Sequence, residues 1–277
     1  MRDKLEKLLR FEAEKFPGVM GIGVKDLEEG DKILVNGDEV FPIGSSIKIP
    51  ILIEFFNKAE AGVINLDELL ALKEEYTVGG SGVLQELQPG KVTMSLLDYA
   101  TLMITVSDNV ATNILIDIVG MEDVNRTLTR LGLERTKLRR KMMDYEAAKA
   151  GQENVSTPRE MIELMDRLYR GKGLSPYVCE STLNIMKKPK LGVIRASVPD
   201  EIPVADKSGG VEGVSCDIGI VFLPRRPYAI AVMTKHIPIS DFHGLDTRRT
   251  MIHVTGLVQT YFQEMDLATP LGRRVPR

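Results

Sequence analysis

The chain has 277 residues, of which 43% are hydrophobic and 27% charged, and its formal net charge is −3. This composition is typical of a globular protein long enough for one large domain or two that share a core. Mild acidity without a long basic run argues against a nucleic-acid partner, and no apolar run approaches the roughly 18 residues of a membrane span.

The N-terminal part begins with a helix. Apolar residues recur at helical spacing over 3–16, and Pro17-Gly18 ends the pattern. Residues 19–24 and 32–35 predict two strands joined by a turn rich in Glu and Gly. From Ser45 to Gly62 the pattern is helical again.

The middle of the chain predicts several helices. Ser95–Asp98 is a capping box that opens a helix running to Ser107, and another helix follows to Gly120. Thr157–Glu160 is a second capping box, with proline at the first helical position, and it leads a helix to Arg170.

The C-terminal part returns to strands. From Val204 the period becomes strand-like, and Val214–Phe222 and Tyr228–Lys235 predict a pair joined by a Pro-Arg-Arg-Pro turn. The apolar residues between Met251 and Phe262 predict a final amphipathic helix.

Strands at both ends with helices between them predict an α+β fold. We expect an α/β/α sandwich, in which an antiparallel sheet is built from both termini and flanked by the terminal helices. Residues 1–60 and 195–277 would form this sheet-plus-helix subdomain, and 61–194 an inserted, all-helical subdomain. We expect the active site between the two, where ligand sites often lie.

Metal and disulfide chemistry find little support. Cys179 and Cys216 are far apart and make no disulfide framework, and the three histidines form no H-E-x-x-H or similar pattern. Met1–Phe11 is charged and lacks the apolar centre of a signal peptide. The protein would therefore be cytoplasmic, or would be secreted or periplasmic with its signal peptide already removed.

Three short motifs carry the chemistry. They read S-x-x-K, S-D-N and K-[ST]-G, at Ser45-Ser46-Ile47-Lys48, Ser107-Asp108-Asn109 and Lys207-Ser208-Gly209. Each is weak alone, since a serine three residues before a lysine arises by chance about once in such a chain. In this order and at long separations, chance is a poor explanation.

The first motif suggests an activated nucleophile. Ser45 starts a helix, and Lys48 follows one turn later on the same face. A serine hydroxyl needs a base to take its proton, and a lysine serves if desolvation and nearby cations lower its pKa. Lys207 is a candidate for such a cation.

The other two motifs suggest substrate contacts. Ser107 could pass a proton from Lys48 to a leaving nitrogen, and Asn109 could hold a substrate amide. Lys207 and Ser208 could bind a substrate carboxylate at a strand edge, beside Gly209. Gly210 would let the backbone approach closely, and its N–H with that of Ser45 would form an oxyanion hole.

These segments resemble those of the class A β-lactamases and related penicillin-recognising serine hydrolases. The matches extend over Phe41–Pro50, Met94–Ile114 and Asp206–Val221, with Ser208 where threonine is more usual. The resemblance covers nearly the whole chain. It implies a β-lactamase/transpeptidase-like fold and an acyl-enzyme on Ser45, with no metal or organic cofactor. We further expect a small-molecule substrate, no nucleic-acid or membrane partner, and a monomer.

One segment departs from the family pattern. Class A enzymes carry R-x-E-x-x-L-N before the helix that starts at Pro158, and its Glu activates the deacylating water. Aligning Arg139 or Arg140 with this Arg puts Lys141 or Met142 at the Glu position. The nearest carboxylates are those of Asp144 and Glu146, with the carboxylate of Glu153 more distant. We favour Glu146 as the catalytic base because its longer side chain could reach a cleft.

Three functions remain open. The first is a β-lactam hydrolase. The second is a related D,D-peptidase or esterase in which Lys48 is the base in both steps. The third is a β-lactam-binding sensor that is acylated and never released. Turnover separates the third function from the other two.

Overall fold

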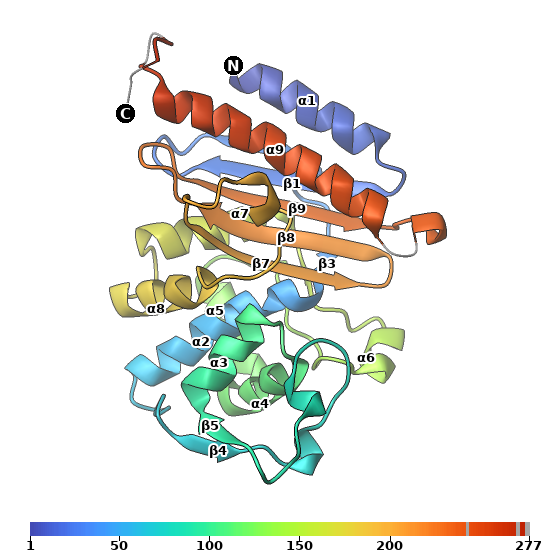
Figure 1. Ribbon diagram of the computed structural model, residues 1–277, viewed down its shortest axis with the longest axis vertical. Coiled ribbons are helices and arrows are strands. Elements are labelled where there is room, and N and C mark those ends of the chain that lie inside the picture. Colours follow the sequence, from blue (N-terminus) through green and yellow to red (C-terminus); the bar gives the residue numbers. More distant parts are fainter. Residues whose placement is uncertain (242–243, 270–271, 275–277) are drawn as a thin grey trace. The chain divides into compact units, whose positions relative to one another are not determined.

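The computed structural model describes residues 1–241, 244–269 and 272–274 (Figure 1). Its chain forms two compact units. The sheet unit is drawn from residues 1–46, 156–170 and 191–277, and the helical unit from 47–155 and 171–190. Relative to the expected boundaries, the helix after Ser45 joins the helical unit and the helix after Thr157 joins the sheet unit.

A five-stranded antiparallel sheet, in the order β2-β1-β9-β8-β7, forms the centre of the sheet unit. The strands are β1 (Val19–Asp26), β2 (Lys32–Val35), β7 (Val204–Val211), β8 (Val214–Val221) and β9 (Tyr228–Lys235). β1 pairs with β9 along its whole length, from Val19 opposite Lys235 to Asp26 opposite Tyr228. The prediction of one sheet built from both termini is confirmed.

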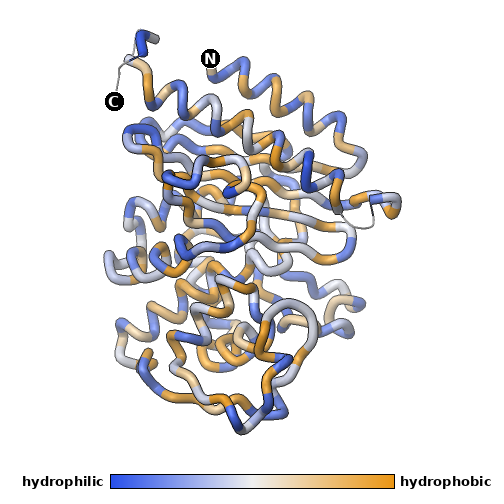
Figure 2. Tube along the Cα trace, in the orientation of Figure 1, coloured by the Kyte–Doolittle hydropathy of each residue, from blue (hydrophilic) through white to orange (hydrophobic). Residues whose placement is uncertain are grey.

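Helices cover both faces of this sheet. α1 (Arg2–Lys15) and α9 (Leu245–Leu267) pack together on one face, and α7 (Pro158–Arg170) packs on the other against β1, β8 and β9 (Figure 1). Most residues of the central strands β1, β8 and β9 are buried, because both faces of the sheet are covered, and Figure 2 shows hydrophobic residues recurring along them. The α/β/α sandwich expected from the sequence is confirmed.

The start of α7 explains two features of the sequence. Thr157 Oγ1 accepts a hydrogen bond of 3.1 Å from the Glu160 amide, so the expected cap is present. A Cβ atom added at Gly21 or Gly23 of β1 would lie 2.7 Å from an atom of Pro158. The Gly-x-Gly of β1 therefore lets α7 lie close to the sheet.

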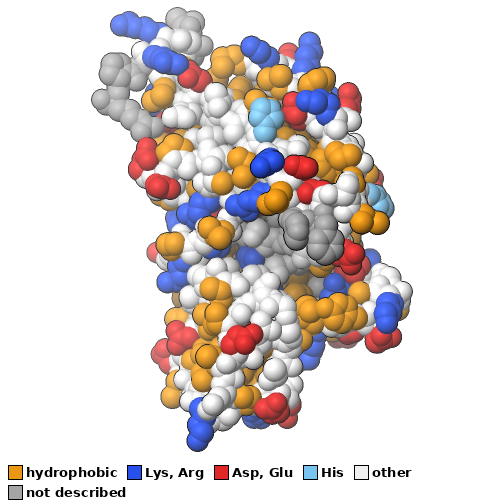
Figure 3. Space-filling view, turned by 45° about the vertical axis from the view of Figure 1, so that its right-hand side comes forward, with side chains coloured by type: hydrophobic (Ala, Val, Ile, Leu, Met, Phe, Trp, Pro, Cys, Tyr) orange, Lys and Arg blue, Asp and Glu red, His pale blue; other side chains and the backbone are white. Residues whose placement is uncertain are grey.

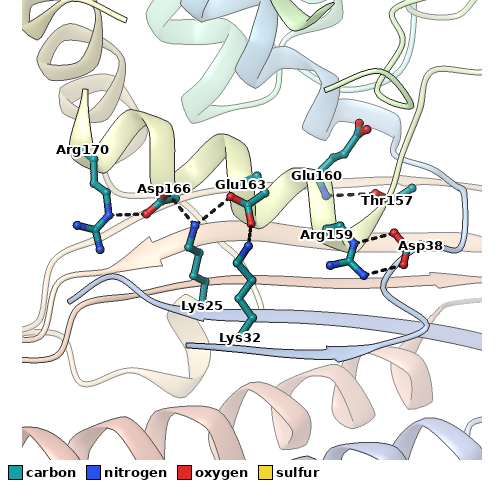
Figure 4. Close-up of polar contacts among 9 residues, drawn as sticks. All are labelled: Lys25, Lys32, Asp38, Thr157, Arg159, Glu160, Glu163, Asp166 and Arg170. Carbon is teal, nitrogen blue, oxygen red and sulfur yellow. Dashed lines mark hydrogen bonds and ion pairs between the residues drawn. The ribbon is translucent and has the colours of Figure 1, made fainter. Parts of the chain in front are cut away.

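A charged network joins α7 to β1 and β2 (Figure 4). Lys25 Nζ lies 2.8 Å from Asp166 Oδ2 and 2.9 Å from Glu163 Oε2, while Lys32 also pairs with Glu163 and Arg170 with Asp166. Burial raises the pKa of Asp166, but hydrogen bonds from Lys25 and Arg170 outweigh it and hold this pKa below its usual value. Lys25 is thus the central cation of a buried network.

Replacing Lys25 by methionine should destabilise the protein by about 3 kcal/mol, because it leaves buried carboxylates without their main counter-charge. The free energy of unfolding in urea at pH 7 measures the effect. The matched control is Arg159→Met, which breaks the exposed pair of Arg159 with Asp38, whose side chains are 43% and 61% exposed. That change should cost less than about 1 kcal/mol. Equal costs for the two variants would contradict a special role for the buried network.

Helix α2 (Lys48–Glu60) lies at the centre of the helical unit and packs against α3, α4, α5 and α8. The other helices are α3 (Leu96–Thr105), α4 (Asn109–Val119), α5 (Met121–Arg130), α6 (Tyr145–Lys149) and α8 (Pro176–Met186). An antiparallel pair, β4 (Leu69–Ala71) and β5 (Thr93–Ser95), adds strand structure to this otherwise helical unit. The remaining strands are β3 (Phe41–Pro42) and β6 (Val155–Ser156).

The surface carries both signs of charge, interspersed with apolar side chains, on the face drawn in Figure 3. Among the described helices, none is both long enough and apolar enough to cross a membrane. The described residues also contain no group of three or more His, Cys, Asp or Glu side chains placed to hold a metal ion.

Candidate active site

Ser45 lies in a short 3-10 helix, Gly44–Ile47, that runs directly into α2. Gly44 has a left-handed backbone with φ of +45°, which turns the chain into this helix. The next residue, Ser46, is buried and donates from Oγ to the Lys207 carbonyl over 2.9 Å. The nucleophile segment is therefore fastened to β7 at the residue after Ser45.

The third motif lies on β7, an edge strand of the sheet. A Cβ atom added at Gly209 would lie 2.3 Å from the Ile43 carbonyl oxygen and 2.9 Å from the Ser45 nitrogen. A Cβ atom added at Gly44 would lie 2.7 Å from the Gly210 nitrogen. The glycines thus bring the backbone around Ser45 and Gly210 together, which an oxyanion hole made from their two amides requires.

Lys207 is almost fully buried beside these glycines. It is 2% exposed, and its Nζ donates to the Ser208 carbonyl over 2.7 Å. Ser208 Cα pairs with Asp217 across β7 and β8. The structure therefore places Lys207, Ser208, Gly209 and Gly210 on one strand, β7, which is paired with β8 within the sheet unit.

Two buried carboxylates support this strand. Asp206 pairs with Arg195 over 3.1 Å, and Asp217 Oδ2 accepts amide hydrogen bonds from Val193 and Ile194. Burial, followed by the nearby charge of Asp206, raises the pKa of Asp217 to about 7. The ion pair of Asp206 and the hydrogen bonds to Asp217 hold residues 193–195 against β7 and β8.

Lys48 is fully buried within the helical unit and contacts the second motif. Its Nζ donates to the Ser107 carbonyl over 2.7 Å, to Ser107 Oγ over 3.1 Å and to Asn109 Oδ1 over 3.1 Å. Ser107 has a left-handed backbone with φ of +54°, an uncommon conformation for a residue with a side chain. The structure thus brings Lys48, Ser107 and Asn109 into one cluster, which we call the lysine cluster.

Asp108 holds the lysine cluster in place, a role that the sequence reasoning did not assign. Its Oδ2 accepts from the amides of Val83 and Leu84, over 2.7 and 2.9 Å, and its Oδ1 accepts from Ala111 as the cap of α4. Asn109 Nδ2 also donates to the Gly79 carbonyl. The loop 79–84 is therefore fixed against the second motif.

The loop from Leu138 to Asn154 is closed at its base. Arg140 Nη2 lies 2.9 Å from Glu153 Oε2, and Asn154 Oδ1 accepts from the amides of Arg139 and Arg140. Since Arg140 forms the ion pair that closes the loop, we align Arg140 rather than Arg139 with the family's Arg. This alignment puts Met142 at the position of the family's Glu.

Asn113 of α4 holds the backbone of Met142 on both sides. Its Nδ2 donates to the Met142 carbonyl over 3.1 Å, and its Oδ1 accepts from the Met142 amide over 2.8 Å. A Cβ atom added at Gly80 would lie 2.5 Å from Asn109 Nδ2 and 2.9 Å from Met143 Sδ, so both groups border Gly80. This part of the loop therefore lies next to the lysine cluster.

The structure does not bring Glu146 to the lysine cluster. Its side chain is 85% exposed on α6, and its Oε1 lies 2.8 Å from Lys149 Nζ. Asp144 caps α6 by accepting from the Ala147 amide over 3.0 Å. Both carboxylates are exposed and bond to neighbouring residues of α6.

Known proteins resemble the chain along most of its length. The model of a β-lactamase enzyme family matches residues 1–254. An imipenem-hydrolysing β-lactamase of Enterobacter cloacae is 29% identical over 227 residues, which cover 79% of this chain and 77% of that protein. β-Lactamase 1 of Streptomyces cacaoi is 29% identical over 276 residues, which cover 92% of this chain and 83% of that protein.

Solved structures show the same fold. A β-lactamase from Sphaerobacter thermophilus superimposes with a TM-score of 0.85 at 29% identity, covering 94% of this chain and 97% of that one. A protein named PBP-A superimposes with a TM-score of 0.83 at 30% identity, covering 94% and 96%. A variant of PBP-A is known as an acyl-enzyme complex with penicillin G.

Proposed function

Because the chain belongs to the β-lactamase enzyme family, we propose that it is a serine hydrolase that opens β-lactam amides through an acyl-enzyme on Ser45. One observation carries the proposal. Lys48, three residues after Ser45, is fully buried, and its Nζ lies within hydrogen-bond distance of three uncharged oxygens of Ser107 and Asn109, of which the Ser107 hydroxyl can donate to a neutral amine. Burial disfavours the charged form of a lysine, which suits a general base.

The acylation step uses the groups of the three motifs. Ser45 Oγ bonds to the lactam carbonyl carbon, and Lys48 takes the serine proton. The carbon–nitrogen bond then breaks, and a proton passes through Ser107 Oγ to the leaving nitrogen. The amides of Ser45 and Gly210 stabilise the oxyanion, and in measured cases one such donor is worth about 3 kcal/mol. Asn109 holds the substrate amide.

Lys207 and Ser208 bind the carboxylate of the substrate, so Lys207→Ala should have a selective effect. Acylation by benzylpenicillin, which carries a carboxylate, should slow about 10- to 100-fold, since a hydrogen bond to a charged group contributes about 1.5–3 kcal/mol. Hydrolysis of the neutral ester p-nitrophenyl butyrate should change little. Stopped-flow rates on the two substrates measure the difference.

The matched control for Lys207 is Lys235→Ala, because Lys235 also lies in the sheet but pairs with Glu39. That variant should keep both rates. Equal losses of Lys207→Ala on the ester and on penicillin would contradict a carboxylate-binding role.

Deacylation is the slow step in this proposal. Met142, which cannot take a proton from water, occupies the position that the family resemblance gives to the water-activating Glu. The acyl-enzyme should therefore accumulate. Intact-mass spectrometry over time, after mixing with benzylpenicillin, tests the function directly. A mass shift that forms and then slowly disappears supports a slow β-lactamase, a permanent shift indicates a sensor, and no shift contradicts acylation.

A further inference from the structure

A cavity of about 320 Å³ lies in the sheet unit, and none of the three motifs contributes to it. It is bounded by the β1–β2 hairpin, the β8–β9 turn and the helices α1 and α9. Its floor includes the buried apolar side chains of Val24, Ile33 and Phe262. This volume and an apolar floor are typical of sites for small molecules.

Only some of the charged side chains on the rim of the cavity form ion pairs with one another. Arg226 Nη1 lies 3.0 Å from Asp26 Oδ2 and 3.0 Å from Glu29 Oε1, so these three groups satisfy one another. The carboxylate of Asp31, also on the rim, forms no ion pair or hydrogen bond with the described part of the chain. The rim therefore presents a carboxylate that is available to a ligand.

The guanidinium of Arg2 also lies on the rim of this cavity. Arg2 Nη2 donates over 2.8 Å to the carbonyl of Lys32, the residue that follows Asp31. Arg2 makes no ion pair with a carboxylate within the described ranges. A negative and a positive group thus lie on the rim of the same cavity, Asp31 directly before β2 and Arg2 at the start of α1, and apolar side chains line the cavity beside them.

Tyr261 adds a neutral polar group to the wall. Its ring lies edge-on to Phe262, with centroids 5.1 Å apart, and its hydroxyl has no hydrogen-bond partner in the described residues. Burial and the nearby charges of Asp26 and Asp31 raise the pKa of this phenol, and a phenol is protonated and can donate at neutral pH even without such a shift. The hydroxyl is therefore available to an acceptor on a ligand.

We propose that this cavity binds a free α-amino acid with an apolar side chain. An α-amino acid carries an ammonium and a carboxylate on one carbon, which matches the carboxylate of Asp31 and the guanidinium of Arg2 on one cavity rim. Its side chain packs on the floor formed by Val24, Ile33 and Phe262. The excess of carboxylates over guanidinium groups on the rim further favours the ammonium end. This inference is independent of the proposed function at Ser45.

L-phenylalanine is the probe, titrated into the full chain and followed by two-dimensional NMR. We expect saturable binding with a dissociation constant of about 1 mM or tighter. Phenethylamine lacks the carboxylate and 3-phenylpropionate lacks the ammonium, so each should bind about fivefold more weakly, the effect of one exposed charge pair. Binding of either analogue as tight as that of phenylalanine, or no saturable binding of phenylalanine, would overturn the proposal.

Two variants test the charges separately. Asp31→Asn should weaken phenylalanine and phenethylamine about fivefold and leave 3-phenylpropionate unchanged, while Arg2→Gln should weaken phenylalanine and 3-phenylpropionate. The matched control is Asp67→Asn, an exposed aspartate outside the cavity, which should alter none of the three. Phenylalanine binding that survives both cavity variants unchanged would place the ligand elsewhere. Ser45→Ala should leave phenylalanine binding intact, which separates this test from the test of the proposed function.

Discussion

Replacing Ser45 by alanine should abolish covalent labelling of the protein by benzylpenicillin. The substitution removes the oxygen that forms the ester, and no other step in the mechanism can replace that bond. Removal of the nucleophile from a serine hydrolase costs about 10⁶-fold in rate in a measured case, so the expected result is complete loss of labelling. Intact-mass spectrometry after incubation with excess benzylpenicillin measures the labelled fraction.

Ser46→Ala is the matched control because it removes a hydroxyl only one residue away. Ser46 Oγ is buried and bonded to the Lys207 carbonyl, so it has no access to a substrate. This variant should still be labelled, although more slowly if β7 shifts. Labelling of Ser45→Ala at wild-type stoichiometry would show that another residue is the nucleophile.

Local signals in the sequence predicted much of the fold. The capping boxes at Ser95 and Thr157 mark the starts of α3 and α7 as the structure has them. Alternating and continuous apolar runs located β1, β8 and β9, because both faces of these strands are buried. The sequence did not reveal the β4–β5 pair, since its strands have three residues each and none of these residues is buried.

The sequence motifs identified the side chains of the lysine cluster, but not the residues that hold these side chains in place. Asp108 accepts hydrogen bonds from the backbone amides of residues 24 and 25 positions earlier in the chain. A contact over such a distance produces no hydrophobic periodicity or local motif in the sequence. Similarly, Asn113 holds Met142 from 29 positions away. The sequence left Arg139 and Arg140 as equal alternatives, and only the ion pair with Glu153 distinguishes them.

Replacing Met142 by glutamate should convert a long-lived acyl-enzyme into one that turns over. Asn113 bonds the backbone of Met142 at both its amide and its carbonyl, so the substitution changes the side chain on a backbone that is already held. A carboxylate in this position could activate a water for attack on the ester. General base catalysis contributes about 10²–10⁴-fold, and the rate of deacylation should rise by that factor. The lifetime of the acyl-enzyme, followed by intact mass after a penicillin pulse, measures it.

Met142→Gln is the matched control because its side chain has nearly the shape of glutamate but cannot take a proton. Glu146→Gln in the wild-type background should leave the acyl-enzyme lifetime unchanged, because that carboxylate is exposed and paired with Lys149. If Met142→Glu releases the acyl group no faster than Met142→Gln, then position 142 does not face the ester. If the wild-type protein turns over without a burst, a base already acts in this site, and Lys48 is the first group to test.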